Sequence, residues 1–164
     1  MSDGTVFQSA QGGKTHIHMN VSDIMTQNPV TIRPTNTLRD ALEIMDQMSC
    51  HHLPVLSSQN HLVGIITARD CRLALRLPDV VREYWQNDES AARLLVRTVM
   101  TPAPTVVTPD TTAQEAARMM MRHYVSCLPV MRDETLIGII TISDILVAFT
   151  KMRQDMDDHG KKHS

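Results

Sequence analysis

The stretch Leu62–Asp70, LVGIITARD, decides the fold, because it returns almost unchanged as Leu136–Asp144, LIGIITISD. In both copies an apolar run typical of a buried strand ends in Thr-x-x-Asp, and helix-like sequence follows. A strand that delivers Thr-x-x-Asp to the start of a helix brings a hydroxyl, a carboxylate and backbone N–H groups to one place. The sequence therefore predicts two similar places that suit a small ligand.

The repeat extends far beyond this stretch. Residues 21–75 align with residues 96–149 at an offset of 75, which falls to 74 after one deletion near Asn60. The shared residues include Met-Thr at 25–26 and 100–101 and Leu-Pro-Val at 53–55 and 128–130. A repeat of this length predicts two copies of one folding unit.

Each copy contains the same series of predicted elements. The β-branched runs Val30–Ile32 and Thr105–Val107, each followed by a proline, predict short strands. The apolar runs at 53–56 and 62–66, and again at 128–131 and 136–140, are separated by short polar turns and predict antiparallel hairpins. The fold class is therefore α/β (α+β), with two β-α-β-β-α units. Because about 55 residues are marginal for an independent core, the units should pack together with pseudo-two-fold symmetry.

A helix is predicted between the first strand and the hairpin of each copy. Thr37 with Asp40, and Thr112 with Glu115, have the spacing of a capping box. The apolar positions that follow recur with helical period. They are Leu38, Ala41, Leu42, Met45 and Met48 in the first copy and Ala113, Ala116, Ala117 and Met120 in the second.

The remaining segments set the expected domain organisation. Residues 1–19 are polar and aperiodic, so we expect a mobile tail that need not be native. Units at 20–75 and 96–150 are joined by a helical linker at 76–95, where Tyr84 and Trp85 could dock on the units. The polar residues 151–164 should fray after the last helix.

Composition excludes several classes of protein. A net charge of −2 gives no strong field for nucleic acid or an anionic membrane. No window approaches 18 apolar residues, and no secretory signal is visible. Cys50, Cys71 and Cys127 form no CxxC, which favours buried thiols in a reducing cytoplasm. His16 and His18 lack the further ligands of a metal site, so no metal is expected.

This combination of motifs resembles a tandem pair of CBS (cystathionine-β-synthase-type) domains, the Bateman module, over roughly residues 20–150. The signs are Asp-Ile-Met-Thr at 23–26, Thr-Val-Met-Thr at 98–101, the Leu-Pro-Val strands and both Gly-Ile-Ile-Thr-x-x-Asp runs. The resemblance implies a regulatory module that binds AMP, ADP, ATP or S-adenosylmethionine in two clefts and has no cofactor of its own. It also implies a homodimer that acts on a separate protein in trans.

The Thr-x-x-Asp motifs have two interpretations that are compatible with each other. Locally they are capping boxes. In the resembled family the Asp holds a ribose and the Thr supports it, while the helix start suits a phosphate. The resemblance implies that each cleft is shared between the units. One would use Ile65, Thr67, Arg69 and Asp70 with Ala103, Thr105, Val125 and Ser126; the other would use Ile139, Thr141, Ser143 and Asp144 with Asn28, Val30, Cys50 and His51.

A histidine pair precedes the first Leu-Pro-Val strand. By the resemblance, His51 and His52 would contact phosphates; the alternative is one packed and one solvated imidazole, because neighbours on a strand point to opposite faces. The second copy has Ser126 and Cys127 instead, which makes the clefts unequal.

Two other functions remain open at this point. The paired units could be a dimerisation scaffold that binds no nucleotide. An enzyme could use Asp70 or Asp144 as a base, but no acid, nucleophile or metal cluster accompanies them. We therefore expect no enzyme and no catalytic residues.

Overall fold

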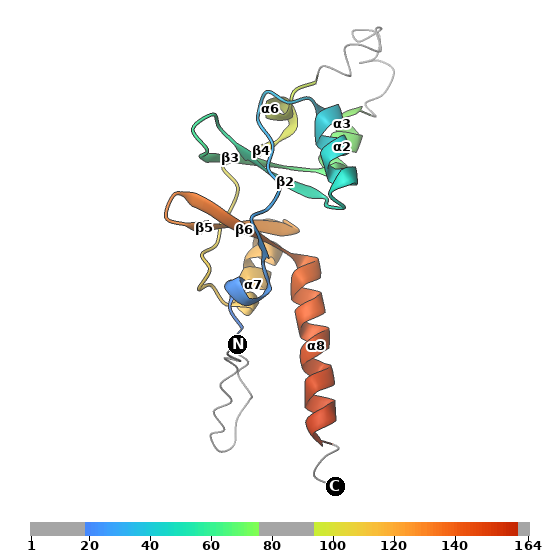
Figure 1. Ribbon diagram of the computed structural model, residues 1–164, viewed down its shortest axis with the longest axis vertical. Helices are drawn as coiled ribbons and strands as arrows, with labels where there is room; N and C mark the ends of the chain where they lie inside the picture. The colour runs from blue at the N-terminus through green and yellow to red at the C-terminus, as the bar shows by residue number, and fades with distance from the viewer. Residues whose placement is uncertain (1–18, 76–93, 161–164) are drawn as a thin grey trace.

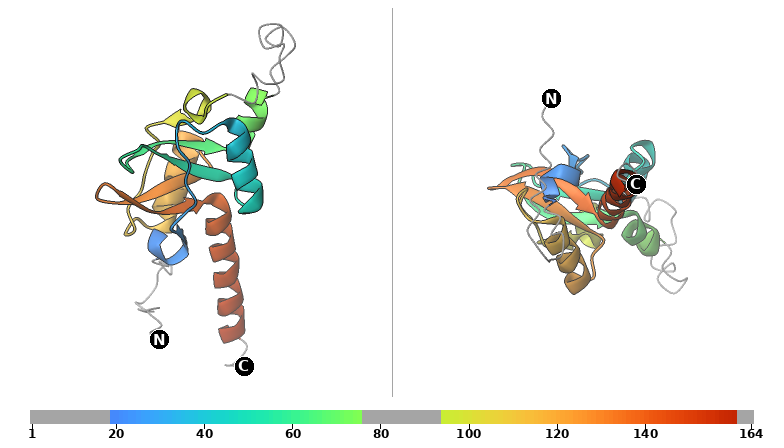
Figure 2. Two further views of the ribbon diagram at one scale, coloured as in Figure 1. Left: turned by 45° about the horizontal axis from the view of Figure 1, so that its top comes forward. Right: turned by 90° about the horizontal axis from the view of Figure 1, so that it is seen from below.

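The computed structural model describes residues 19–75 and 94–160, with side chains up to residue 151. Within these ranges the strands form two three-stranded antiparallel sheets, β2-β3-β4 and β1-β6-β5. The sheets lie as two layers, with α2 and α3 beside one and α7 and α8 beside the other (Figures 1 and 2). The elements are α1 (Val21–Ile24), β1 (Thr26–Gln27), α2 (Leu38–Gln47), β2 (His52–Leu56), β3 (Leu62–Thr67), α3 (Ala68–Leu75), α6 (Val96–Val99), β4 (Thr101–Pro102), α7 (Ala113–His123), β5 (Cys127–Arg132), β6 (Thr135–Thr141) and α8 (Ile142–Gly160).

The two units exchange their opening segments. β1 belongs to the first copy but pairs with β6 of the second, with Thr26 opposite Ile139. β4 of the second copy pairs with β3 of the first, with Thr101 opposite Ile65. The preceding turns follow the same exchange, since Val21 is buried in the second core and Val96 in the first. Neither copy therefore completes its sheet or its core without the other.

The glycine of each Gly-Ile-Ile-Thr run permits this exchange. A Cβ on Gly64 would lie 2.6 Å from the Met100 sulfur and 3.0 Å from the Thr101 carbonyl oxygen. A Cβ on Gly138 would lie 2.6 Å from the Met25 sulfur. The Met-Thr motif and the glycine are thus two sides of one contact between the units.

The predicted hairpins and helices are present. Thr67 lies opposite His52, and Thr141 lies opposite Cys127. The Thr37 hydroxyl accepts from the Asp40 N–H at 3.1 Å, and the Asp40 carboxylate accepts from the Thr37 N–H at 2.8 Å, so the first capping box is complete.

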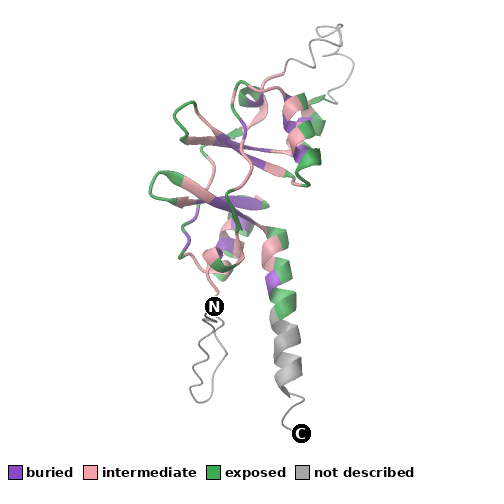
Figure 3. Cartoon of the chain, in the orientation of Figure 1, coloured by how far each residue is buried: buried purple, intermediate pink, exposed green. Residues whose placement is uncertain are grey.

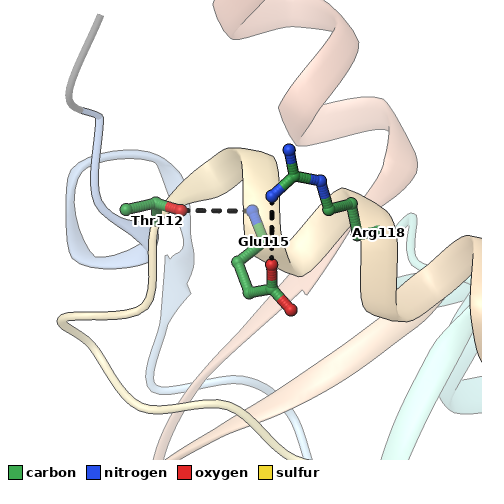
Figure 4. A network of polar contacts seen from close by, with 3 residues as sticks. All are labelled: Thr112, Glu115 and Arg118. Carbon is green, nitrogen blue, oxygen red and sulfur yellow. Dashed lines mark hydrogen bonds and ion pairs between the residues drawn. The ribbon is translucent and has the colours of Figure 1, made fainter. Parts of the chain in front are cut away.

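The second capping box is only half-formed, which corrects the prediction. The Thr112 hydroxyl accepts from the Glu115 N–H at 3.1 Å. The Glu115 carboxylate lies 3.4 Å from Arg118 instead of bonding to the Thr112 N–H (Figure 4). Glutamate at this position can reach an i+3 arginine, and the resulting exposed pair contributes little stability.

Two predicted strands were wrong. Val30–Ile32 and Thr105–Val107 contribute only the single parallel bridges Ile32–Val55 and Val107–Val130. The strands that open each unit come earlier, as β1 and β4. The chain after β1 and after β4 runs from the sheet of the opposite unit to the sheet of its own unit. Only one residue of each segment, Ile32 or Val107, therefore pairs with a strand of its own sheet.

The described ends of the helices also differ from expectation. Met48 is 55% exposed, because α2 ends at Gln47 and Met48 follows as its C-cap. The segment expected to fray from residue 151 continues as α8 to Gly160. Tyr84, Trp85 and most of the predicted linker and N-terminal tail lie outside the described residues.

Two main cores hold the units, and a smaller one joins them. Leu38, Ala41 and Met45 of α2 pack in the first core, and Ala116 and Met120 of α7 pack in the second. Figure 3 shows the buried residues concentrated along the strands and the inner helix faces. Ile65, Cys127 and Ile139 form a third buried cluster with residues from both sheets. The surface between the sheets is therefore apolar at its centre.

Candidate functional site

Both Thr-x-x-Asp motifs stand where a strand becomes a helix. β3 ends at Thr67 and α3 begins at Ala68; β6 ends at Thr141 and α8 begins at Ile142. The Asp70 carboxylate oxygen Oδ2 accepts from the Thr67 N–H at 3.1 Å and from its hydroxyl at 2.6 Å. The corresponding Asp144 distances are both 2.7 Å. Each carboxylate is half-buried and held in one orientation by its threonine.

The N–H groups at these helix starts are partly used by the protein. The Asp70 N–H donates to the Thr67 hydroxyl at 3.1 Å, and the Ala68 N–H donates to the His51 carbonyl at 3.0 Å. The Ile142 N–H likewise donates to the Ser126 carbonyl at 3.0 Å. Fewer N–H donors are left for a phosphate than the sequence suggested. The carboxylate is therefore the dominant polar group of each Thr-x-x-Asp junction, Thr67–Asp70 or Thr141–Asp144, which we call a tip.

One side chain links the two units beside these tips. His52 Nε2 lies 2.8 Å from Ser126 Oγ, in a hydrogen bond that joins the starts of β2 and β5. His52 occupies the position in the first copy that Cys127 occupies in the second. The resemblance implied that both histidines contact phosphates, with one packed and one solvated imidazole as the alternative. In the structure His52 is half-buried and bridges the sheets, and His51 is exposed.

The charges of both carboxylates act on this bridge. Burial lowers the pKa of His52, with a further lowering by His51, while the charges of Asp70 and Asp144 both act to raise it. Burial raises the pKa of the Cys127 thiol to about 12, and Asp70 adds to that increase. Asp70 thus acts on a residue of the second unit, and Asp144 on a residue of the first. The charge of each tip therefore acts on a residue of the opposite unit.

The predicted aliphatic residues lie at the centre of that interface. Ile65 and Ile139 are only 8% and 7% exposed and pack with Cys127. They form the floor between the sheets. Arg69 and Ser143 lie on the exposed side of the same helix starts.

The predicted partners from the opening segments lie at the crossings between the sheets. Asn28 and Ala103 are exposed residues in left-handed backbone conformation, with φ of 48° and 46°. Their N–H groups donate to the carbonyls of Ile137 and Val63 in the opposite unit. Val30 and Thr105 follow and are half-buried.

The remaining predicted residues precede β2 and β5. His51 was assigned to the Asp144 cleft and Ser126 to the Asp70 cleft. Their carbonyls accept from the N–H groups of Ala68 and Ile142 at the helix starts of their own units, while the Ser126 hydroxyl bonds to His52 of the other unit. Cys50 and Val125, which precede them, are half-buried and donate to the last turns of α2 and α7. His52 makes a side-chain hydrogen bond across the interface, and no sequence pattern indicated Ser126 as its partner.

The CBS domain family matches residues 21–77 and 96–151. The chain belongs to the CBS-domain family, as a tandem pair. A CBS domain-containing protein of Dictyostelium discoideum is 33% identical over 133 residues, which cover 80% of this chain and 92% of that protein. An inosine-5′-monophosphate dehydrogenase of Methanocaldococcus jannaschii is 32% identical over 125 residues, but the CBS pair spans only 22% of the enzyme.

Solved structures give the same fold. CBSX2 of Arabidopsis thaliana in complex with AMP is 30% identical, with a TM-score of 0.67 over 82% of this chain and 98% of that chain. The CBS domain pair of protein MJ0100, in complex with 5′-methylthioadenosine and S-adenosyl-L-methionine, has a TM-score of 0.69 at 24% identity over 82% of this chain. The second likeness concerns the fold alone.

Two features were searched for within the described residues. None of the helices there combines the length and apolarity needed to cross a membrane. The described part of the chain also brings together no group of three His, Cys, Asp or Glu side chains that could hold a metal ion.

Proposed function

We propose that this CBS pair is a regulatory module that binds adenosine-containing ligands at the interface between its sheets, one beside Asp70 and one beside Asp144. The observation that carries the proposal is the pair of carboxylates that their threonines hold in one orientation at the two strand-to-helix junctions, both of which act on His52 at the contact between the units. The AMP complex of a 30% identical CBS pair supports the ligand class. The proposal assigns no catalytic step to the chain.

Each carboxylate is arranged to accept hydrogen bonds from a ribose. Oδ2 of Asp70 is occupied by Thr67, and among the described residues no protein group donates to Oδ1. Oδ1 can therefore accept from the ribose hydroxyls without a change of rotamer, and the threonine keeps the carboxylate in place. The exposed His51, beside this tip, is the member of the histidine pair available to a phosphate, because His52 bonds to Ser126.

Regulation would follow from the exchange of opening segments. A ligand beside Asp70 contacts a surface built from both units, so its affinity depends on how the two sheets are arranged. Ligand binding would favour one arrangement by its difference in affinity for the two arrangements, and a separate partner protein would respond to that change.

Ligand-dependent melting tests this proposal. Tm is measured with AMP, ADP, ATP, S-adenosylmethionine and NADH; a ligand at one hundred times its Kd adds roughly 2.7 kcal/mol to the free energy of unfolding. Asp70→Asn and Asp144→Asn should each remove the contribution of one site. If none of the five ligands raises Tm, or if the double variant still binds, the proposal fails.

Asp40→Asn is the matched control. Asp40 makes the same cap with Thr37, at 2.8 Å and 3.1 Å, but belongs to α2 and lies apart from the interface residues described above. Its substitution should lower Tm by a similar amount, because the cap is weakened in the same way, and should leave the ligand-induced increase in Tm unchanged. This comparison separates lost binding from a weakened helix start.

A second proposal, the homodimer, rests on an exposed apolar stripe of α8. Ile142, Leu146 and Phe149 recur at helical spacing and are 44%, 59% and 61% exposed. A second copy of the chain could bury this stripe, either as part of the sensor or as a scaffold that binds no nucleotide. Sedimentation of wild type and Leu146→Glu tests it: the wild type should be a dimer and the variant a monomer. A monomeric wild type would exclude the homodimer.

A further inference from the structure

The two units differ on the outer side of the hairpin, where the first unit has an arginine side chain and the second unit has none at the aligned position. Arg33 follows the crossing segment and extends across to the turn between β2 and β3. Its guanidinium donates to the Leu56 carbonyl at 3.3 Å, to the Ser57 carbonyl, and to Asn60 Oδ1 at 2.8 Å. The side chain thus ties the crossing segment to the hairpin turn.

The second unit has the same backbone framework at these positions. In both units the residue that forms the isolated β-bridge donates its N–H to a proline carbonyl at 3.0 Å. Ile32 donates to Pro54 in the first unit, and Val107 donates to Pro129 in the second. The next residue, Arg33 or Thr108, donates its N–H to a side-chain oxygen three residues later, at 3.0 Å or 3.1 Å. The frameworks therefore correspond up to the hairpin turn, where the second unit is one residue shorter and has no counterpart of Asn60.

In the second unit the corresponding position holds no arginine. Thr108 stands where Arg33 stands in the repeat, and its hydroxyl lies 3.1 Å from that of Thr111. A cavity of about 540 Å³ opens there. We call it the unit-2 groove, and define it by Thr108, Met119 and Met131 with Glu115 and Asp133. It lies on the hairpin and α7, away from the Asp70 and Asp144 tips.

The charges around the groove favour a cation. Asp133 takes the place of Ser58 in the aligned turn and is exposed. Glu115 takes the place of Asp40, whose carboxylate is closed on the Thr37 N–H. The Glu115 carboxylate is instead turned away from the helix start and makes only a 3.4 Å contact with Arg118, a pair whose side chains are 43% and 59% exposed (Figure 4). The groove thus has two carboxylates, one of them in contact with Arg118, where the first unit has one carboxylate bonded to Thr37 and a serine.

We propose that the unit-2 groove receives the guanidinium of an arginine side chain from a partner protein. The first unit shows that this framework accommodates such a side chain. The apolar stem would pack on Met119 and Met131, which adapt readily to an inserted chain. The guanidinium would bond to Asp133 and Glu115 and to the carbonyls of the turn, which suits its several fixed donors. The neighbouring Val106 is 40% exposed, so the groove opens to the surface where a protein can reach it.

Methionine-methyl NMR of the full chain tests the proposal with Nα-acetyl-arginine amide as the probe. The Met119 and Met131 methyl signals, assigned by Met→Leu substitution, should shift saturably, while Met45 in the first core should not. Nα-acetyl-citrulline amide, which lacks the charge, should produce no saturable shift. Absence of saturation with the arginine probe, or equal shifts with citrulline, would overturn the proposal. Tighter binding of free arginine than of the capped amide would overturn the assignment to a protein side chain.

Three variants make the test independent of folding defects. Thr108→Arg recreates the arrangement of the first unit, so it should fill the groove, keep or raise Tm, and abolish the shifts. Asp133→Asn changes an exposed side chain and should raise the Kd of the arginine probe about two- to fivefold, as expected for the loss of an exposed ion pair. Ser58→Asn, at the matching turn of the first unit, should leave binding unchanged. Undiminished binding in Thr108→Arg would disprove the location.

Discussion

Gly64→Ala tests the exchange of opening segments directly. The new Cβ would lie 2.6 Å from the Met100 sulfur, 3.1 Å from its Cγ and 3.0 Å from the Thr101 carbonyl. Ordinary carbon contacts are about 3.5–4.0 Å, so the sulfur must move by about 1 Å. The Met100 side chain packs against the first core, and the Thr101 carbonyl is fixed by the β3–β4 pairing. Overpacking of this kind costs about 1–3 kcal/mol.

Part of that cost is offset in the unfolded chain. Replacing glycine by alanine reduces the freedom of the unfolded chain and stabilises by about 0.4–1 kcal/mol where no strain arises. The net loss should therefore be about 1–2 kcal/mol. For a chain of this size that corresponds to a decrease in Tm of about 2–8 °C, measured by thermal and urea unfolding.

Double-mutant cycles distinguish the exchanged arrangement from its alternative. Met100→Ala removes the sulfur that the new methyl group meets, so Gly64→Ala with Met100→Ala should cost less than the sum of the single changes, by roughly 1 kcal/mol. Gly64→Ala with Met25→Ala should be additive, because Met25 contacts Gly138 in the other sheet. Coupling to Met25 instead of Met100, or a neutral Gly64→Ala, would refute the exchange.

Three further results are expected. Thr67→Val removes the cap of α3 and should lower the free energy of unfolding by about 1 kcal/mol, whereas Thr67→Ser should retain most of it; urea unfolding measures both. Burial lowers the pKa of His52, so the unfolded chain binds more protons at this site. The free energy of unfolding should therefore fall as the pH drops from 6.5, the ordinary pKa of histidine, through the lower pKa of the folded state. His52→Gln should flatten that part of the stability–pH curve, and an unchanged curve would contradict the assignment. Burial raises the pKa of the Cys127 thiol to about 12, so at pH 8 a disulfide reagent should label it about a thousandfold more slowly than an exposed thiol. Rapid labelling of Cys127 in the folded chain would show that it is not buried.

The parts of the fold predicted correctly depend on local chemistry. Thr37 and Thr112 cap helices because a hydroxyl three residues before an N–H meets it in any helix start. The hairpins follow from apolar runs separated by short polar turns. The Thr-x-x-Asp tips were recognised for the same reason, since their bonds join residues three positions apart.

The predictions that were wrong concern segments whose conformation depends on contacts with residues far away in the sequence. Val30–Ile32 has the composition of a strand, but the exchange of β1 leaves it spanning the gap between two sheets. The sequence also did not predict that the carbonyls of His51 and Ser126 accept from the first N–H of the following helix in their own unit. Nothing in the sequence near His52 indicates Ser126, 74 residues away, as its partner.

The comparison of the two copies separates residues that the fold requires from residues that define a surface. The glycine and the Met-Thr opening recur because they make a contact between the units, and the Thr-x-x-Asp tip recurs because it holds the start of the following helix. His52 against Cys127, and Arg33 against Thr108, differ although the surrounding backbone hydrogen bonds coincide. At such positions a side chain can change without loss of the framework. One unit consequently presents an imidazole bridge and a filled groove, and the other presents a buried thiol and an open groove. Because the interface contains residues from both units, the imidazole and the thiol lie in one shared electrostatic environment, and the two tips are chemically unequal from the outset.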